Sequence, residues 1–358
     1  MRSKHNISEP PKASPAERQV PGYQTPLRIK KWYDDPKVAL DKVYWKPKSE
    51  AWFWAACTAW ILALAENLLV PSAQNVNQVP YRVLLGFFIA VLLARYLYGR
   101  ARPEFRKKLY HKAQFIFAGG AALTIWDLLT TKSGLLPVPY FPGLAEISRV
   151  MYDDRLLLLR STLYSMRLFF VGLITGTALG LATGTFIGWW RQWDYWLSPV
   201  IRVSGIVPAV AWLPVALLVF PTSFVTGVFL IFISSWFPVS SMMAAGIIAT
   251  PRAYYEVAKT MGAGDRFLLY RIAIPNAMPS MFTGIMTATA FSFTTLIVSE
   301  MVGAKAGLGF YINWAKGWGI YSKVYGAIII IAVEFALILA LIGLLRDSVL
   351  RWQKGVLK

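Results

Sequence analysis

Residues 250–275 read TPRAYYEVAKTMGAGDRFLLYRIAIP and lie between two long apolar runs, Ser223–Ile248 and Pro279–Met301. A few residues are enough to reverse a chain, so a polar stretch of this length predicts a structure of its own. Thr250 and Pro251 are typical of a helix start, with a hydroxyl N-cap and a proline at the first helical position. The stretch is therefore expected to form a docking surface for another protein.

Two short helices are predicted within this stretch. Arg252–Met261 suits the first helix, and Gly262 is placed to end it with a positive φ. Gly264 and Asp265 offer a break and a new N-cap, and a second helix is expected to run to about Ile272. Pro275 should prevent its simple continuation, and Pro279 should start the next apolar helix.

The composition is that of an integral membrane protein. Hydrophobic residues make up 56% of the chain and charged residues 15%, and the mean hydropathy is +0.48. Several uncharged runs reach the roughly 20 residues that a membrane helix needs, and they lack the alternation of barrel strands. An all-α polytopic fold with eight spans is predicted. The spans are Ala51–Val70, Pro80–Tyr98, Phe115–Thr131, Thr162–Trp190, Pro199–Phe220, Ser223–Ile248, Pro279–Met301 and Val324–Leu345.

The charge distribution predicts the orientation of these spans. Lys and Arg number 37 against 18 Asp and Glu, a net charge of +19. That excess could suggest nucleic acid in a soluble protein, but here it concentrates in loops that alternate along the chain, as in the cytoplasmic loops of membrane proteins. Both termini and the 250–275 loop are therefore expected in the cytoplasm. The basic segments are residues 1–49, Arg95–Lys112, Arg191–Trp196, Arg252–Arg271 and Arg346–Lys358.

Acidic residues within spans are costly and are functional candidates for that reason. Glu300, near the outer end of the seventh span, is expected to anchor the Gly303–Gly309 segment or to shape a gate. Glu334 lies deep in the last span and needs a hydroxyl or a basic partner. Glu66 and Asp127 lie near helix ends and are expected to reach water.

The spacing Glu256-x-Ala258, Gly262, Ile272-x-Ile274-Pro275 resembles the cytoplasmic "EAA" loop of ABC importer permeases. That loop reads Glu-Ala-Ala, three residues, Gly, nine residues, Ile-x-Leu-Pro, and the intervals match without a gap. Further stretches resemble the nitrate, sulfonate, taurine and bicarbonate permease class. These are Phe141-Pro142, Arg160–Leu163, Pro208–Pro214, Ser299-Glu300-Met301 and Gly307-Leu308-Gly309.

The resemblance covers about Phe115 to Leu350, six of the eight spans, and implies a type I ABC importer permease core. Two extra spans within 51–114 precede that core, which is predicted over 115–350. Basic tails are expected at 1–50, largely disordered, and at 351–358. The residues that would couple the loop to its ATPase are Glu256, Ala258, Gly262, Ala263, Gly264, Asp265, Ile272 and Pro275.

The family implies a division of labour between chains. A separate ABC ATPase, present in two copies, would bind ATP and Mg, since this sequence holds no phosphate-binding loop. A second permease copy, as a homodimer or a heterodimer, would complete the pathway. A periplasmic or lipid-tethered binding protein would deliver the solute across a bacterial inner membrane. No cofactor, metal or nucleic acid is expected on this chain.

Two sets of residues are candidates for the pathway and for its movement. Gly172, Gly176, Gly180, Gly184 and Gly188 recur every four residues, a spacing that lets helices approach closely in lipid, either as a static contact or as a sliding one. Proline, hydroxyl and aromatic residues of spans five to seven are candidates to line the pathway. They are Pro208, Trp212, Ser234, Ser235, Phe237, Phe291, Thr294 and Thr295.

Two classes of solute are compatible with the resemblance. A small anion of the nitrate, sulfonate or bicarbonate type is the first expectation, and an aromatic carboxylate or vitamin precursor is the alternative. A non-transporting membrane scaffold or sensor would carry the same loop. A membrane enzyme is disfavoured, because the two histidines, His5 and His111, lie outside the predicted spans and no nucleophile–base arrangement is present.

Overall fold

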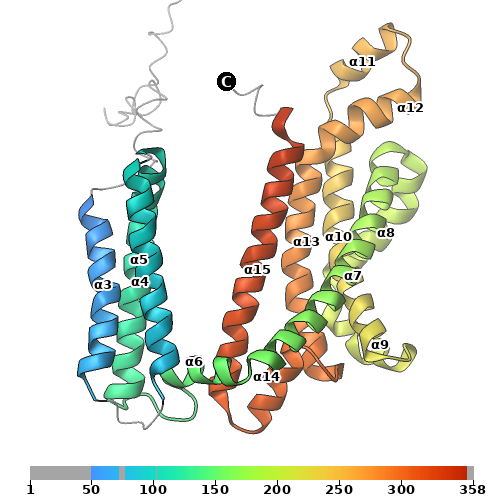
Figure 1. The fold of residues 1–358 in the computed structure, drawn as a ribbon. Helices are drawn as coiled ribbons and strands as arrows, with labels where there is room; N and C mark the ends of the chain where they lie inside the picture. Colours follow the sequence, from blue (N-terminus) through green and yellow to red (C-terminus); the bar gives the residue numbers. More distant parts are fainter. Residues whose placement is uncertain (1–49, 72–76, 102, 353–358) are drawn as a thin grey trace, which may run out of the picture. The chain divides into compact units, whose positions relative to one another are not determined.

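The computed structural model describes residues 50–71, 77–101 and 103–352, and all its regular elements there are helices (Figure 1). The prediction of an all-α polytopic protein is confirmed. Seven of the described helices are long and apolar enough to cross a membrane, and one bent pair of helices adds an eighth candidate span. The tails predicted at 1–50 and 351–358 lie almost wholly outside the described residues.

The chain divides into two compact units, one of residues 1–57 and 92–118 and the other of 58–91 and 119–358. Three helices contribute to both units: α3 (Glu50–Leu69), α4 (Val79–Ala101) and α5 (Pro103–Asp127). In the first unit, Phe53, Cys57, Leu109 and Ala113 form a small apolar core, and the Phe53 ring stacks on Tyr96. Because the division runs through these helices, the predicted boundary near residue 115 remains a prediction.

The second unit holds the remaining helices. They are a π-helical turn (Leu128–Lys132), α6 (Leu144–Asp153), α7 (Arg155–Trp189), α8 (Arg191–Ile206), a 3₁₀ turn (Ala209–Trp212), α9 (Leu213–Val219), α10 (Ser223–Ile248), α11 (Arg252–Thr260), α12 (Asp265–Phe267), a second π-helical turn (Leu268–Ala273), α13 (Ile274–Gly303), α14 (Leu308–Gly317) and α15 (Tyr321–Val349). The short helices α11 and α12 lie at one end of this helix bundle, and α6, α9 and α14 lie at the opposite end (Figure 1).

Helix α10 is the centre of this unit and packs most extensively against α7 and α13. The glycine row of α7 faces it. A Cβ on Gly172, Gly180 or Gly188 would come within 2.6–2.8 Å of the Cβ of Ile231, Val239 or Ile247, respectively. Real Cβ atoms essentially never approach so closely, so these positions accept only glycine at this helix separation. The glycines were predicted to bring two helices together, and the two helices are α7 and α10.

The predicted span Pro199–Phe220 is not one helix. Helices α8 and α9 meet at an angle of 91°, with the break at Val207 and Pro208. Proline disfavours the helical conformation of the residue before it, and Val207 accordingly has an extended ψ of 115°. The prolines are visible in the sequence, but the sideways turn that they cause here was not predicted.

The prediction that Pro275 and Pro279 separate two helices is also wrong, because neither proline interrupts the helix. One continuous helical segment runs from Asp265 to Gly303. Residues Leu268–Ala273 form a π-helical turn just before Pro275. This turn already departs from the i→i−4 hydrogen-bond pattern, so the missing proline N–H falls where that pattern is interrupted in any case.

Two further predictions are wrong. Asp127 does not reach water, since it is 0% exposed, and neither of its carboxylate oxygens has a hydrogen-bond partner. The Glu66 carboxylate oxygens are also buried within the second unit. Thr250 does not cap α11, which begins after Pro251 with no side-chain cap. The Thr250 hydroxyl donates instead to the Gly246 carbonyl oxygen at 3.3 Å.

Candidate functional site

The loop between α10 and α13 is a helical hairpin whose corner depends on Gly262. The Gly262 N–H donates to the Lys259 carbonyl at 2.9 Å, and the Ala263 N–H donates to the Ala258 carbonyl at 3.0 Å. These two bonds make a Schellman motif, which requires a left-handed residue after the helix cap. Gly262 supplies it with a φ of +82°, which confirms the predicted helix end.

The base of the hairpin is fixed to the bundle. Leu269 and Ala273 are buried against Met243 and Ile247 of α10, and the Tyr255 ring packs edge-on against Trp189. The Asn276 amide donates to the Thr250 hydroxyl at 3.1 Å, which joins the end of α10 to the start of α13. The hairpin is therefore attached to both helices.

The predicted coupling residues divide into two groups by burial. Glu256, Gly262, Gly264 and Asp265 are exposed, whereas Ala263, Ile272 and Pro275 are half-buried and Ala258 is buried. The hairpin also exposes large apolar side chains beyond the end of the bundle. They are Tyr254, Val257, Met261, Phe267 and Tyr270, each more than half exposed. This set is called the hairpin face below, and a group of exposed large apolar side chains is typical of a docking site.

Six of the eight predicted pathway residues line one cavity. Its volume is about 410 Å³, and it lies where the break between α8 and α9 meets α10 and α13. The predicted residues that line it are Pro208, Ser234, Phe237, Phe291, Thr294 and Thr295. The other lining residues were not predicted; they are Ser204, Gly205, Val207, Ala209, Val210 and Ile233.

Two predicted pathway residues lie elsewhere. Ser235 is fully buried against Gly176 in the contact between α7 and α10. Trp212 belongs to the 3₁₀ turn and is partly exposed outside the cavity lining. Consecutive residues of an α-helix are rotated by about 100° around its axis. Ser234 therefore faces the cavity, while Ser235 faces the contact with α7.

Glu300 lies at the opposite end of α13 from the hairpin and holds the start of α14. Its Oε2 accepts hydrogen bonds from the Gly309 N–H and from the Ser165 hydroxyl, both at 2.9 Å. The Ser165 oxygen in turn accepts the Leu308 N–H at 2.9 Å. Glu300 is 1% exposed, so this carboxylate joins α7, α13 and α14 without facing solvent. Glu300 thus contacts the segment Gly303–Gly309 through Gly309, as expected of an anchoring residue.

Glu334 on α15 lies near the hydroxyl of Thr162 on α7. Its Oε1 is buried without a hydrogen bond.

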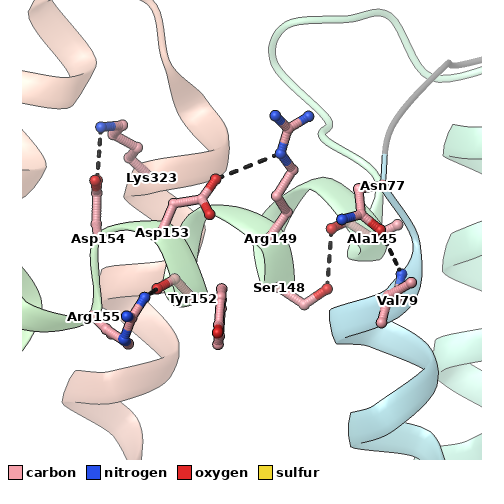
Figure 2. Close-up of polar contacts among 10 residues, drawn as sticks. All are labelled: Asn77, Val79, Ala145, Ser148, Arg149, Tyr152, Asp153, Asp154, Arg155 and Lys323. Carbon is pink, nitrogen blue, oxygen red and sulfur yellow. Dashed lines mark hydrogen bonds and ion pairs between the residues drawn. The ribbon is translucent and has the colours of Figure 1, made fainter.

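A polar network near α6 was not foreseen. Asp154, between α6 and α7, pairs with Lys323 of α15 at 2.6 Å and accepts a 2.7 Å hydrogen bond from the Tyr311 hydroxyl of α14. Figure 2 shows Lys323 reaching Asp154, beside the separate pair of Arg149 and Asp153 along α6. Burial alone would raise the pKa of Asp154, but the bonds from Lys323 and Tyr311 outweigh it and hold this pKa below its ordinary value.

Comparison with known proteins agrees with these features. The bicarbonate transport system permease protein CmpB of Synechococcus elongatus is 29% identical over 189 residues, 52% of this chain and 65% of the relative. The nitrate import permease protein NrtB of Leptolyngbya laminosa is 31% identical over 179 residues, 50% of this chain and 64% of the relative. These matches span less than two thirds of either relative's length.

A longer match is found to the putative aliphatic sulfonates transport permease protein SsuC of Bacillus subtilis. It is 25% identical over 253 residues, 70% of this chain and 91% of the relative. The family model of binding-protein-dependent transport system inner membrane components matches residues 165–354, more than half of the chain. The matched segment runs from α7 to the end of α15 and includes the hairpin, the cavity and Glu300. The chain therefore belongs to the family of binding-protein-dependent transport system inner membrane components.

Proposed function

We propose that this chain is the transmembrane subunit of an ATP-driven importer, where it forms the solute pathway and is moved by a separate ATPase. The single observation that carries this is the hairpin of α11 and α12. It presents an apolar face beyond the bundle while its base is fixed to α10 and α13, two helices that line the cavity. A partner that moves the hairpin therefore moves the cavity walls.

The ATPase would supply ATP and Mg chemistry, and two copies of it would act on two permease copies. A second copy of this chain is the simplest arrangement, and a related permease chain is the alternative. A solute-binding protein, periplasmic or tethered to lipid, would deliver the solute at the end of the bundle that carries α6, α9 and α14. The chain itself would catalyse no reaction.

The orientation follows from charge. We propose that the hairpin and both termini face the cytoplasm, because the basic loops, including Arg252–Arg271, all fall on that side of the predicted spans. The hairpin would then meet the ATPase in the compartment that holds ATP.

The solute is proposed to be an anion. The relatives are named for bicarbonate, nitrate and aliphatic sulfonates. An aromatic carboxylate or a vitamin precursor, carried by the same machinery, is the second candidate.

Reconstitution tests the proposed function. The chain is purified from its native membrane under conditions that keep partners bound, and the complex is placed in liposomes with the binding protein. We expect an ATPase subunit with a phosphate-binding loop to copurify and ATP-dependent uptake to follow. The Val257→Asp variant, which puts a charge on the hairpin face, should lose the ATPase. A chain that retains the ATPase but never transports any solute would instead be a scaffold or sensor.

A further inference from the structure

Three polar side chains come together between the first three membrane helices. Glu66 belongs to α3, Tyr81 to α4, and Asp127 is the last residue of α5. All three lie in the second compact unit. Glu66 lies near Asp127, and Tyr81 lies near both carboxyl groups. The match to the family model begins only at residue 165, so membership of the family does not account for this cluster.

The two carboxyl groups of the cluster are withdrawn from water. Asp127 is 0% exposed, and Tyr81 beside it is 3% exposed. All four carboxyl oxygens of Glu66 and Asp127 are buried, and none accepts a hydrogen bond from the described part of the chain. Burying an ionised carboxylate without donors is far more costly than burying the neutral acid, and two carboxylates close together also repel each other. Both groups therefore cannot be ionised without compensation.

One positive side chain balances part of this charge. Lys132, in the π-helical turn after α5, lies near Glu66. The other basic residue close by in sequence, Arg82 of α4, bonds to Asn67 and Gln78, and within the described ranges it forms no ion pair with either carboxylate. Two carboxylates and one ammonium group leave a single negative charge, which one further cation would neutralise.

A proton suits this position better than a metal ion. No group of three or more His, Cys, Asp and Glu side chains that could hold a metal occurs among the residues that the structure describes. The ammonium group of Lys132 would also repel a metal cation. A proton needs only two oxygens, because a protonated carboxyl group donates a strong hydrogen bond to an ionised one. Such a bond would give a partner to one oxygen of each group.

We propose that Glu66 and Asp127 together bind one proton at neutral pH, with Lys132 balancing the charge that remains. The protonated carboxyl group donates its hydrogen bond to the other carboxylate, beside Tyr81. The proton thereby joins α3, the first of the two additional spans, to α5. This proposal does not depend on the importer function, because none of these residues belongs to the hairpin or to the cavity.

Infrared spectroscopy tests the bound proton directly. The full chain is placed in lipid nanodiscs at neutral pH in choline chloride, and the C=O stretching band of protonated carboxyl groups is measured. Glu66→Gln and Asp127→Asn should each lose the intensity of one such group, because the carboxylate that remains is balanced by Lys132. The double variant should lose no more than either single variant. Lys132→Met should about double the intensity of the pair, since a second proton then replaces the lost charge.

The pH dependence of unfolding gives a second readout. A carboxyl proton that the folded chain holds is released by the unfolded chain above about pH 4. The unfolding equilibrium constant, measured in mixed detergent micelles, should therefore gain a factor of about ten per pH unit between about pH 5 and pH 7. Asp127→Asn should lose this factor. Asp153→Asn is the matched control, because it neutralises a carboxylate that is 58% exposed, and it should keep both the factor and the infrared band.

Three results would overturn the shared proton. Unchanged carboxyl intensity in both amide variants would mean that the two groups are ionised. A double variant that loses twice the intensity of a single variant would mean two separate protonated acids. A band that disappears when sodium chloride replaces choline chloride would mean that a metal cation occupies the site. This last measurement uses the unaltered chain, so it holds even where a variant does not fold.

Discussion

Gly176 on α7 lies directly against Ser235 on α10, so closely that a methyl group at position 176 would overlap the serine hydroxyl and come within 2.6 Å of the Phe232 carbonyl oxygen. Backbone oxygen cannot swing aside as a side chain can. The contact therefore sets the separation of the two helices at the centre of the bundle. Gly176, predicted from the sequence as a gating residue, and Ser235, predicted as a pathway residue, thus contact each other.

Replacement of Gly176 by Ala should destabilise the chain by about 1–3 kcal/mol, because a crowded helix contact must open to accept the methyl group. Thermal unfolding in detergent measures the effect. Gly86 of α4 is the matched control, since its Cβ would meet nothing within 4 Å. Gly86→Ala should be neutral or slightly stabilising. Equal melting temperatures for both variants would contradict the packing role of Gly176.

The hairpin corner offers a comparison between two glycines of one loop. Neither Gly262 nor Gly264 has a neighbour that would obstruct a methyl group, but only Gly262 has a positive φ. Gly262→Ala should strain the corner by roughly 1–2 kcal/mol and lower ATP-driven uptake severalfold, with ATPase activity less dependent on solute. Gly264→Ala should behave as the unaltered chain.

Reconstituted transport and ATPase rates, measured side by side, check this prediction. If uptake by the Gly262→Ala variant stays fully coupled, the hairpin is not the connection to the ATPase.

Asp154 predicts a pH dependence of stability. Its folded pKa is held below the ordinary value, so its contribution is fully present above the unfolded pKa of about 3.9 and is lost as the pH falls through the lower folded pKa. Asp154→Asn should lower the free energy of unfolding at pH 7 by about 1–3 kcal/mol and flatten the loss below pH 4. Unfolding curves recorded at several pH values from about 3 to about 7 measure both effects.

The neighbouring Asp153 is the control for this prediction. Its pair with Arg149 has side chains 49% and 58% exposed, so Asp153→Asn should change stability by no more than about 1 kcal/mol. The two residues are adjacent in sequence and differ in what they touch (Figure 2). Similar losses for both variants would mean that the bonds from Lys323 and Tyr311 do not stabilise the fold.

Glu300 predicts local order in α14. Glu300→Ala removes the acceptor of the Gly309 N–H, and amide exchange at Leu308 and Gly309 should accelerate by about tenfold or more. Glu300→Gln keeps one oxygen acceptor and should show a smaller change. Glu334→Ala, on α15, should leave these two amides unaffected. Hydrogen exchange with mass spectrometry or NMR distinguishes these cases, and unchanged exchange in Glu300→Ala would remove the anchoring role.

Local patterns were sufficient for much of the fold and of the hairpin. Uncharged runs of membrane-spanning length predict the helices, because backbone polar groups in lipid must bond within the helix. Gly262 was identified because its place after a short helix calls for a left-handed residue. The four-residue spacing of glycines predicts a close helix contact, although only the structure shows that α10 is the partner.

Other features depend on contacts that no local pattern contains. Pro275 was expected to end a helix, but the π-helical turn just before it already interrupts the hydrogen-bond pattern where the proline N–H is missing. Asp127 was expected at the water boundary, but neighbouring helices bury it. Ser234 and Ser235 are equivalent in sequence, and their different surroundings follow from which faces of α10 meet α7 and α13.

By itself, the sequence determined the membrane class, the helical hairpin and the family resemblance, because hydropathy, glycine conformation and motif spacing are properties of consecutive residues. Only the tertiary structure decided which side chains share the cavity, what holds Glu300 and Asp154, and where the fifth apolar run turns by 91°. Several of these contacts join residues more than 100 positions apart, as Ser165 and Glu300 are. Their distances are set by helix packing, which the order of residues along the chain does not display.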